Sequence, residues 1–135
     1  MKQIKVEGQW NGREEMMINI SHFPHLHASF TADFENYNRY PHPLEYFLAS
    51  LIGSITLTIK SFIEKRNLSF VNLYITIVGD INPNRMNKFH KLSIHIRLNS
   101  NASPEELTSL QKSLLQEDTI FNLLKDEEII TVNWD

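Results

Sequence analysis

The sequence predicts one α+β domain over residues 1–135, in which antiparallel β-sheets surround a long, buried central helix. Three observations lead to this prediction. Apolar residues recur at helical spacing through residues 42–66, apolar and polar residues alternate as in strands on both sides of that segment, and a capped helix begins near Ser103. The chain has 135 residues, which is enough for one domain with a moderate core.

The composition is that of an ordinary soluble protein, with 41% hydrophobic and 21% charged residues. The formal net charge is −3 and there is no basic stripe, so we expect no binding to nucleic acid. Residues 1–8 lack the apolar core of a secretion signal, which favours a cytoplasmic location. The sequence contains no cysteine, which excludes disulfides and zinc–thiolate sites. We expect no cofactor.

The start of the chain is predicted to form an antiparallel meander. Strands are expected at residues 2–10, 13–20 and 27–32. The Asn11-Gly12 pair is typical of a hairpin turn, because both residues tolerate positive φ. Residues 33–42 then connect the meander to the central helix without a clear period.

The central helix is predicted at residues 42–66. Pro43 suits its first turn, while Glu45 near the start and Lys65 near the end complement the helix dipole. The main apolar face is expected to hold Leu44, Leu48, Leu51, Ile55, Ile59 and Phe62. Other faces are filled by Phe47, Ile52, Leu57 and Ile63. A helix that is apolar nearly all round is a buried helix.

The size of this helix predicts a second subunit. Roughly 23 residues at about 1.5 Å each give a rod of about 35 Å, which is long for a small domain. Ser50, Gly53 and Ser54 are small residues in its middle, where another backbone could come close. A membrane span is the competing interpretation, but the uncharged run of residues 46–59 is shorter than the about 20 residues that a bilayer requires. We therefore expect a homodimer and no membrane.

The rest of the chain is predicted to form a hairpin, two helices and a final strand. The inward residues of the hairpin are expected to be Val71, Leu73, Ile75 and Ile77 on one strand, and Leu92, Ile94, Ile96 and Leu98 on the other. Residues 82–88 supply its turn. Ser103, Pro104 and Glu106 form a capping box for the next helix, and a short helix follows Asp118. The predicted order is β-β-β-α-β-β-α-α-β.

Residues 43–60, PLEYFLASLIGSITLTIK, resemble the central-helix signature of the OsmC/Ohr family of osmotically inducible and organic hydroperoxide resistance proteins. The positions that match or are similar are Pro43, Glu45, Leu48, Ala49, Leu51, Thr58 and Lys60. The resemblance implies an OsmC-like fold and an intertwined homodimer, and the predicted order of elements agrees with it over most of the chain.

The resemblance also implies a chemistry that this chain cannot perform. In the family, a cysteine on the central helix attacks a peroxide and a second cysteine resolves the product to a disulfide. These cysteines fall on Ser54 and on Asp118, or on Glu117 if the alignment slips by one residue. Peroxide reduction requires a thiolate that cycles through sulfenic acid, which a hydroxyl cannot do. We expect no thiol peroxidase activity.

Ser54 and Asp118 also have simpler interpretations. Ser54 is a small residue that allows close packing, and a role as hydrolytic nucleophile is disfavoured because the middle of a helix offers neither a base nor an oxyanion hole. Asp118 is a typical N-cap for the short helix that follows it.

Glu45 has two interpretations of equal weight. It matches a family glutamate that orients a catalytic arginine, and Arg13 or Arg39 could supply that partner here. An arginine–glutamate pair facing a pocket would bind an anion. Alternatively, Glu45 only stabilises the helix N-terminus.

The resemblance further implies an apolar pocket at the dimer interface. Candidate lining residues are Tyr40, Tyr46, Phe47, Ser50, Ser54, Asp118 and Phe121. Aromatic residues of this kind could equally be packed in the core.

Histidines form a second group, and His25 and His27 would share one face of a strand. Two imidazoles can chelate zinc or copper, but no carboxylate joins them at ligand spacing, so metal binding is disfavoured.

The leading hypothesis is a non-catalytic OsmC-like homodimer that binds a small apolar or anionic ligand in its interface pocket. One alternative is an enzyme with replacement acid–base chemistry, which would use Glu45, Asp118 and a histidine or arginine. The other alternative is a structural or partner-binding dimer whose pocket is filled.

Overall fold

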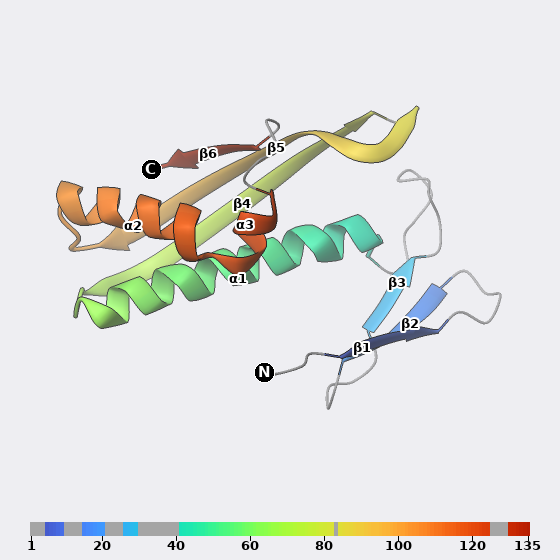
Figure 1. Cartoon of the computed structure of the whole chain (residues 1–135), viewed down its shortest axis with the longest axis horizontal. Coiled ribbons are helices and arrows are strands. Elements are labelled where there is room, and N and C mark those ends of the chain that lie inside the picture. The colour runs from blue at the N-terminus through green and yellow to red at the C-terminus, as the bar shows by residue number, and fades with distance from the viewer. Residues whose placement is uncertain (1–4, 10–14, 21–25, 30–40, 83, 125–129) are drawn as a thin grey trace. The chain divides into compact units, whose positions relative to one another are not determined.

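The computed structural model describes residues 5–9, 15–20, 26–29, 41–82, 84–124 and 130–135 (Figure 1). The elements follow the predicted order, with three strands, one helix, two strands, two helices and one strand. The chain divides into two compact units, residues 1–48 and 49–135. Helix α1 (Pro43–Lys65) begins in the first unit and continues in the second.

The first unit contains the predicted antiparallel meander. Its strands are β1 (Val6–Gln9), β2 (Glu15–Ile20) and β3 (Leu26–Ser29), arranged in the order β1-β2-β3. Both pairs of strands run antiparallel. Val6 of β1 pairs with Ile20 of β2, and Met16 of β2 pairs with Ala28 of β3. The predicted turn at Asn11-Gly12 lies outside the described residues.

Helix α1 ends at a backbone cap formed by Asn67, at a position where glycine is the usual residue. Asn67 has a positive φ of 52°, which asparagine tolerates better than most residues. The Leu68 N–H then donates to the Ile63 carbonyl at 3.1 Å and the Asn67 N–H donates to the Glu64 carbonyl at 3.3 Å. These bonds satisfy carbonyls that the last turn would otherwise leave unpaired.

The second unit contains a sheet in the order β4-β5-β6, which Figure 1 shows as two long strands and one short strand. Its strands are β4 (Phe70–Asn82), β5 (Arg85–Ser100) and β6 (Ile130–Trp134). The first two form the predicted antiparallel hairpin, but the turn is shorter than the expected 82–88, because Asn82 already pairs with Arg85. The β4–β5 pairing continues through the polar residues that were expected to form the turn, because hydrogen bonds between backbones do not require apolar side chains.

Two details of this sheet correct the sequence-based expectations. Strand β6 pairs parallel with β5, whereas only antiparallel sheets were expected. A parallel pair requires a crossover connection, and helices α2 (Pro104–Glu117) and α3 (Thr119–Leu124) provide it. Val71 was expected inward but is 67% exposed, because a register shift between Phe70 and Asn72 interrupts the alternation.

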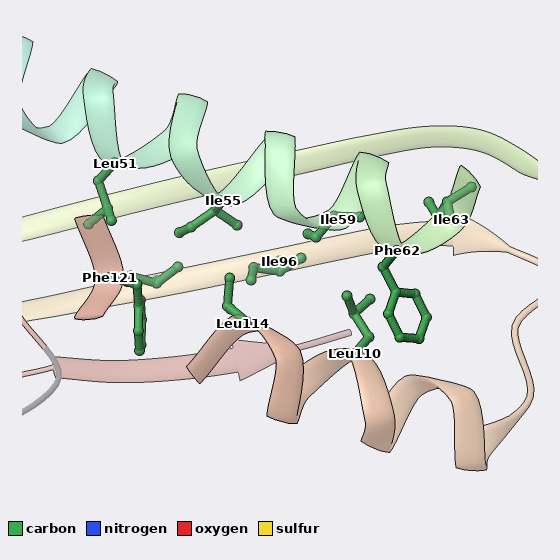
Figure 2. Packing of buried hydrophobic residues seen from close by; sticks show 10 residues of the cluster. Leu51, Ile55, Ile59, Phe62, Ile63, Ile96, Leu110, Leu114 and Phe121 are labelled. Carbon is green, nitrogen blue, oxygen red and sulfur yellow. The ribbon is translucent and has the colours of Figure 1, made fainter. Parts of the chain in front are cut away.

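The core of the second unit lies between the sheet and one face of α1, with α2 and α3 completing it (Figure 2). Its buried residues include Leu51, Ile55, Ile59, Phe62, Ile63, Ile94, Ile96, Leu110, Leu114 and Phe121. Figure 2 shows Leu110 and Leu114 of α2 pointing toward the row of apolar side chains on α1. The predicted capping box of α2 is confirmed, since Ser103 Oγ accepts from the Glu106 N–H while Glu106 Oε1 accepts from the Ser103 N–H.

In the described part of a single chain, helix α1 is buried on one side, and burial of its other faces by a second subunit stays a prediction. Leu57 is 67% exposed, and an added Cβ at Gly53 would meet no atom within 4 Å. By length and composition α1 could cross a membrane, but its row of buried residues makes it the core helix of this fold. Within the described part of the chain, the side of α1 that holds Gly53 and Leu57 is exposed.

Candidate functional site

A buried polar cluster joins α1 to the junction of α2 and α3. The Ser54 hydroxyl donates to Asp118 Oδ1 at 2.8 Å, and the Thr58 hydroxyl donates to Asp118 Oδ2 at 2.9 Å. Ser54 and Thr58 are four residues apart on α1, so their side chains lie on the same face of the helix. The structure thus brings together Ser54 and Asp118, the two positions on which the resemblance places the family cysteines.

Asp118 occupies this place because it ends one helix and begins the next. It is the C-cap residue of α2, with an extended backbone at φ −69° and ψ 121°. Its Oδ1 accepts the Phe121 N–H at 2.7 Å, and its carbonyl accepts the Asn122 N–H at 3.0 Å. The prediction that Asp118 is the N-cap of the short helix is confirmed.

The Asp118 side chain is fully buried, at 0% exposure. A buried carboxylate is costly unless hydrogen bonds replace its lost hydration, and here two hydroxyls and one backbone N–H do so. No buried side-chain nitrogen or oxygen among the described residues lacks a partner. A cluster in which the hydroxyls already donate to the carboxylate is suited to holding three helices together.

Glu45 takes part in the start of α1. Its Oε1 accepts the His42 N–H at 2.9 Å, and its own N–H donates to the His42 carbonyl at 2.9 Å. The buried His42 also accepts the Leu44 N–H on Nδ1 at 3.1 Å. These bonds place Glu45 at the helix start, while its pairing with Arg13 or Arg39 stays a prediction, because both arginines lie outside the described residues.

The remaining predicted pocket residues have varied surroundings. The Tyr46 hydroxyl donates to the His27 carbonyl at 2.7 Å within the first unit. Phe47 is half-buried and Ser50 is exposed, while Phe121 is buried in the core of the second unit. Tyr40 lies outside the described residues, so the pocket as predicted stays a prediction.

The suggested metal ligands can be placed only in part. His27 is half-buried on β3, and His25 lies outside the described residues. Across the part of the chain that the structure describes, no group of three histidine, aspartate or glutamate side chains could hold a metal ion.

A groove between α1 and β4 was missed by sequence reasoning. Its volume is about 690 Å³. Apolar side chains from both elements line it, namely Ile52, Ile59, Ile63, Phe70, Leu73 and Ile75. Thr56 and Tyr74 add polar atoms, and Lys60 and Glu64 stand at its side as an ion pair of 3.7 Å. We name this feature the α1–β4 groove.

One sequence signal does point to this groove. Ile52 and Thr56 extend the core residues Ile59 and Ile63 into a second stripe along one side of the main core face of α1. The strand beside that stripe is β4. It lies at the edge of the sheet because β6 pairs with β5 and not with β4. The sequence pattern does not indicate which strand β6 pairs with.

No curated protein sequence matches this chain closely. Solved structures do share its fold over nearly the whole length. An OsmC-like protein from Mycoplasma pneumoniae is 14% identical, with a TM-score of 0.81 over 99% of this chain and 95% of that chain. A hypothetical protein from Aquifex aeolicus is 13% identical, with a TM-score of 0.81 over 100% of this chain and 96% of that chain.

A third similar structure is an organic hydroperoxide resistance protein OsmC from Legionella pneumophila. It is 12% identical, with a TM-score of 0.67 over 99% of this chain and 96% of that chain. At such identities these likenesses establish the fold alone. The sequence model of the family described as OsmC-like protein matches residues 35–133, which is most of the chain. The chain therefore belongs to the OsmC-like protein family.

Proposed function

We propose that this chain is a non-catalytic OsmC-like homodimer that binds a small apolar or anionic ligand. The observation that supports the proposal most strongly is the hydrogen bond between Ser54 and Asp118. It puts a hydroxyl and a carboxylate, already satisfied by each other, at the two positions on which the resemblance places the redox cysteines.

The proposal includes the loss of thiol peroxidase activity. The similar Legionella protein is described as an organic hydroperoxide resistance protein, and a stress-related role of that kind requires a thiolate in the known chemistry. This sequence contains no cysteine. A serine hydroxyl that donates to a buried aspartate cannot accept oxygen from a peroxide and return it through a disulfide.

The homodimer is supported by the uncovered side of α1. Leu57 is exposed there, and Gly53 leaves room for close approach of another backbone. Leu57 together with the exposed small residues Ala49, Ser50 and Gly53 supports self-association through this side of the helix. Our proposal places this dimer in the cytoplasm, without a membrane or nucleic-acid partner.

Ligand binding is supported by the α1–β4 groove. Its volume of about 690 Å³ falls in the range of small-molecule sites, roughly 300–1,000 Å³, and its lining is mainly apolar. The alternative of replacement acid–base chemistry has less support. Asp118 is fully buried with three protein donors, and Glu45 is engaged at the helix start.

Two measurements test the proposal. Native mass spectrometry of untagged protein should show a dimer that carries a reproducible extra mass. A clean dimer would favour the alternative of a partner-binding protein, and a monomer at micromolar concentration would contradict the homodimer.

The second measurement is consumption of cumene hydroperoxide with dithiothreitol in chelator-treated buffer. We expect the rate of the no-protein control, both for the wild type and for Ser54→Ala. A rate clearly above that control, lost in Ser54→Ala, would show that this chain does retain peroxide chemistry.

A further inference from the structure

We propose that the α1–β4 groove binds an uncharged, elongated apolar molecule such as a medium-length alkyl chain with a neutral polar end. This inference rests on the proposed function, which left apolar and anionic ligands open. It assigns the ligand to a place away from Ser54 and Asp118, since neither residue lines the groove.

The shape of the groove favours an elongated molecule. On α1 its lining runs from Ile52 to Glu64, which corresponds to about 18 Å at about 1.5 Å per residue. On β4 it runs from Phe70 to Ile75, about 17 Å at about 3.3 Å per residue. Two walls of similar length, one from a helix and one from a strand, enclose a long trough.

The apolar lining supplies the attraction. Ile52, Ile59 and Ile63 contribute from α1, and Leu73 and Ile75 from β4. Burial of alkyl surface against such side chains is worth about 25 cal/mol per Å² of area removed from water. Phe70 and Tyr74 of β4 are half or more exposed, so their rings can cover a bound chain.

The charges of the groove argue against an anionic head group. Lys60 is the cation among its lining residues, and its ammonium lies 3.7 Å from the Glu64 carboxylate. A ligand carboxylate that approached Lys60 would therefore also approach Glu64, and the repulsion would offset the attraction. The pair leaves the groove without net charge.

Of the two hydroxyls in the lining of the groove, that of Thr56 is already used as a donor. Thr56 Oγ1 donates to the Ile52 carbonyl at 2.8 Å. A carboxylate moved into the groove would lose hydration without gaining that hydrogen bond, which is costly. A neutral group such as an alcohol loses far less on transfer, so the site discriminates by charge.

The groove can be tested with Nile red, a neutral dye whose emission shifts to the blue in apolar surroundings. Thr56→Phe places a ring in the groove, and Thr108→Phe is its matched control. Thr108 is an exposed helical threonine whose hydroxyl likewise bonds the carbonyl four residues earlier, at 3.0 Å. We expect at least tenfold weaker dye binding in Thr56→Phe and a change of less than twofold in Thr108→Phe.

Competition then tests the ligand class. We expect 1-dodecanol to displace the dye at a concentration at least fivefold lower than dodecanoate does. Equal displacement, or a preference for dodecanoate, would overturn the uncharged class while leaving the broader proposed function intact. Equal dye binding by Thr56→Phe and wild type would overturn the groove as the site.

A charge variant keeps the proposal falsifiable if Thr56→Phe does not fold. Glu64→Gln leaves Lys60 without its partner, so dodecanoate should bind at least threefold more tightly while dodecanol stays within twofold. Glu117→Gln, an exposed acid outside the groove, should change neither. No gain for dodecanoate in Glu64→Gln would contradict the role given to the ion pair.

Dye binding measured together with the oligomeric state shows whether the groove is free for a ligand or is filled by a second copy of the chain. Dye binding should persist at protein concentrations at which native mass spectrometry shows only dimer. Dye binding that appears only on dilution to monomer would show that the partner subunit fills the groove, and would overturn this inference without contradicting the dimer.

Discussion

Ser54 and Asp118 are 64 residues apart in the sequence, and the Ser54 Oγ donates to Asp118 Oδ1 at 2.8 Å. The same carboxylate receives the Thr58 hydroxyl and the Phe121 N–H. In a fold whose relatives are expected to use a reversible disulfide here, this chain has a set of hydrogen bonds that does not depend on redox state. The contribution of these hydrogen bonds to the free energy of unfolding can therefore be measured directly.

Removal of the Asp118 carboxylate should lower the free energy of unfolding substantially. Asp118→Ala leaves two hydroxyls and the Phe121 N–H without an acceptor and removes the N-cap of α3. We expect a loss of about 3 kcal/mol, from unsatisfied buried groups together with the lost cap. Urea denaturation followed by circular dichroism measures it.

Two further variants identify the cause of that loss. Asp118→Asn preserves shape and one acceptor oxygen, so it should cost about 1 kcal/mol. Glu117→Ala changes the exposed neighbour and should stay within about 0.5 kcal/mol. An Asp118→Ala protein as stable as the wild type would mean that the cluster contributes nothing to the fold.

Ser54 and Thr58 should be energetically coupled, because both donate to the same carboxylate. We expect Ser54→Ala and Thr58→Val each to cost about 1 kcal/mol. The double variant should depart from the sum of the two by at least about 0.5 kcal/mol, as is usual for groups in one network. A double-mutant cycle by urea denaturation measures this, and strict additivity would show that the two bonds are independent.

Local signals in the sequence predicted much of the framework of this site. Pro43 and Lys65 are the first and last residues of the observed central helix, within one residue of the predicted bounds 42–66. The capping box at Ser103 and the N-cap at Asp118 were also predictable, because each depends on residues within three positions of the cap.

Features that depend on long-range pairing could not be predicted in the same way. The bond from Thr58 to Asp118 spans 60 residues, and helical spacing shows which residues share a face but not which loop meets that face. The resemblance named Ser54 and Asp118 as a pair, yet nothing in the sequence indicated that Thr58 completes it. The parallel β6 and the α1–β4 groove were missed for the same physical reason.

Gly79 should be intolerant of a side chain. A Cβ at this position would lie 2.6 Å from Phe89 Cε1 and 3.2 Å from Leu92 Cδ2. Since the Phe89 ring must move to admit it, Gly79→Ala should cost about 1–3 kcal/mol. The matched control is Gly53→Ala, where an added Cβ meets nothing within 4 Å in the single chain and alanine favours a helix by up to about 1 kcal/mol. Because the proposed dimer buries the face of α1 that holds Gly53, both variants are compared in the Leu57→Asp background. Thermal unfolding of the two variants should shift in opposite directions, and equal shifts would contradict the packing described at Gly79.

The exposed face of α1 should control self-association. Leu57 is 67% exposed on this helix, in the turn that follows Gly53. Leu57→Asp puts a charge on the face that the proposed dimer buries, and an unpaired buried charge is strongly unfavourable, so we expect at least a hundredfold weaker dimerisation. Leu123→Asp is the matched control, because Leu123 is 78% exposed on α3 and belongs to a different surface. Native mass spectrometry over a dilution series should show monomer for Leu57→Asp where the wild type and Leu123→Asp remain dimeric. If Leu57→Asp remains dimeric as well, a surface other than this face of α1 holds the two subunits together.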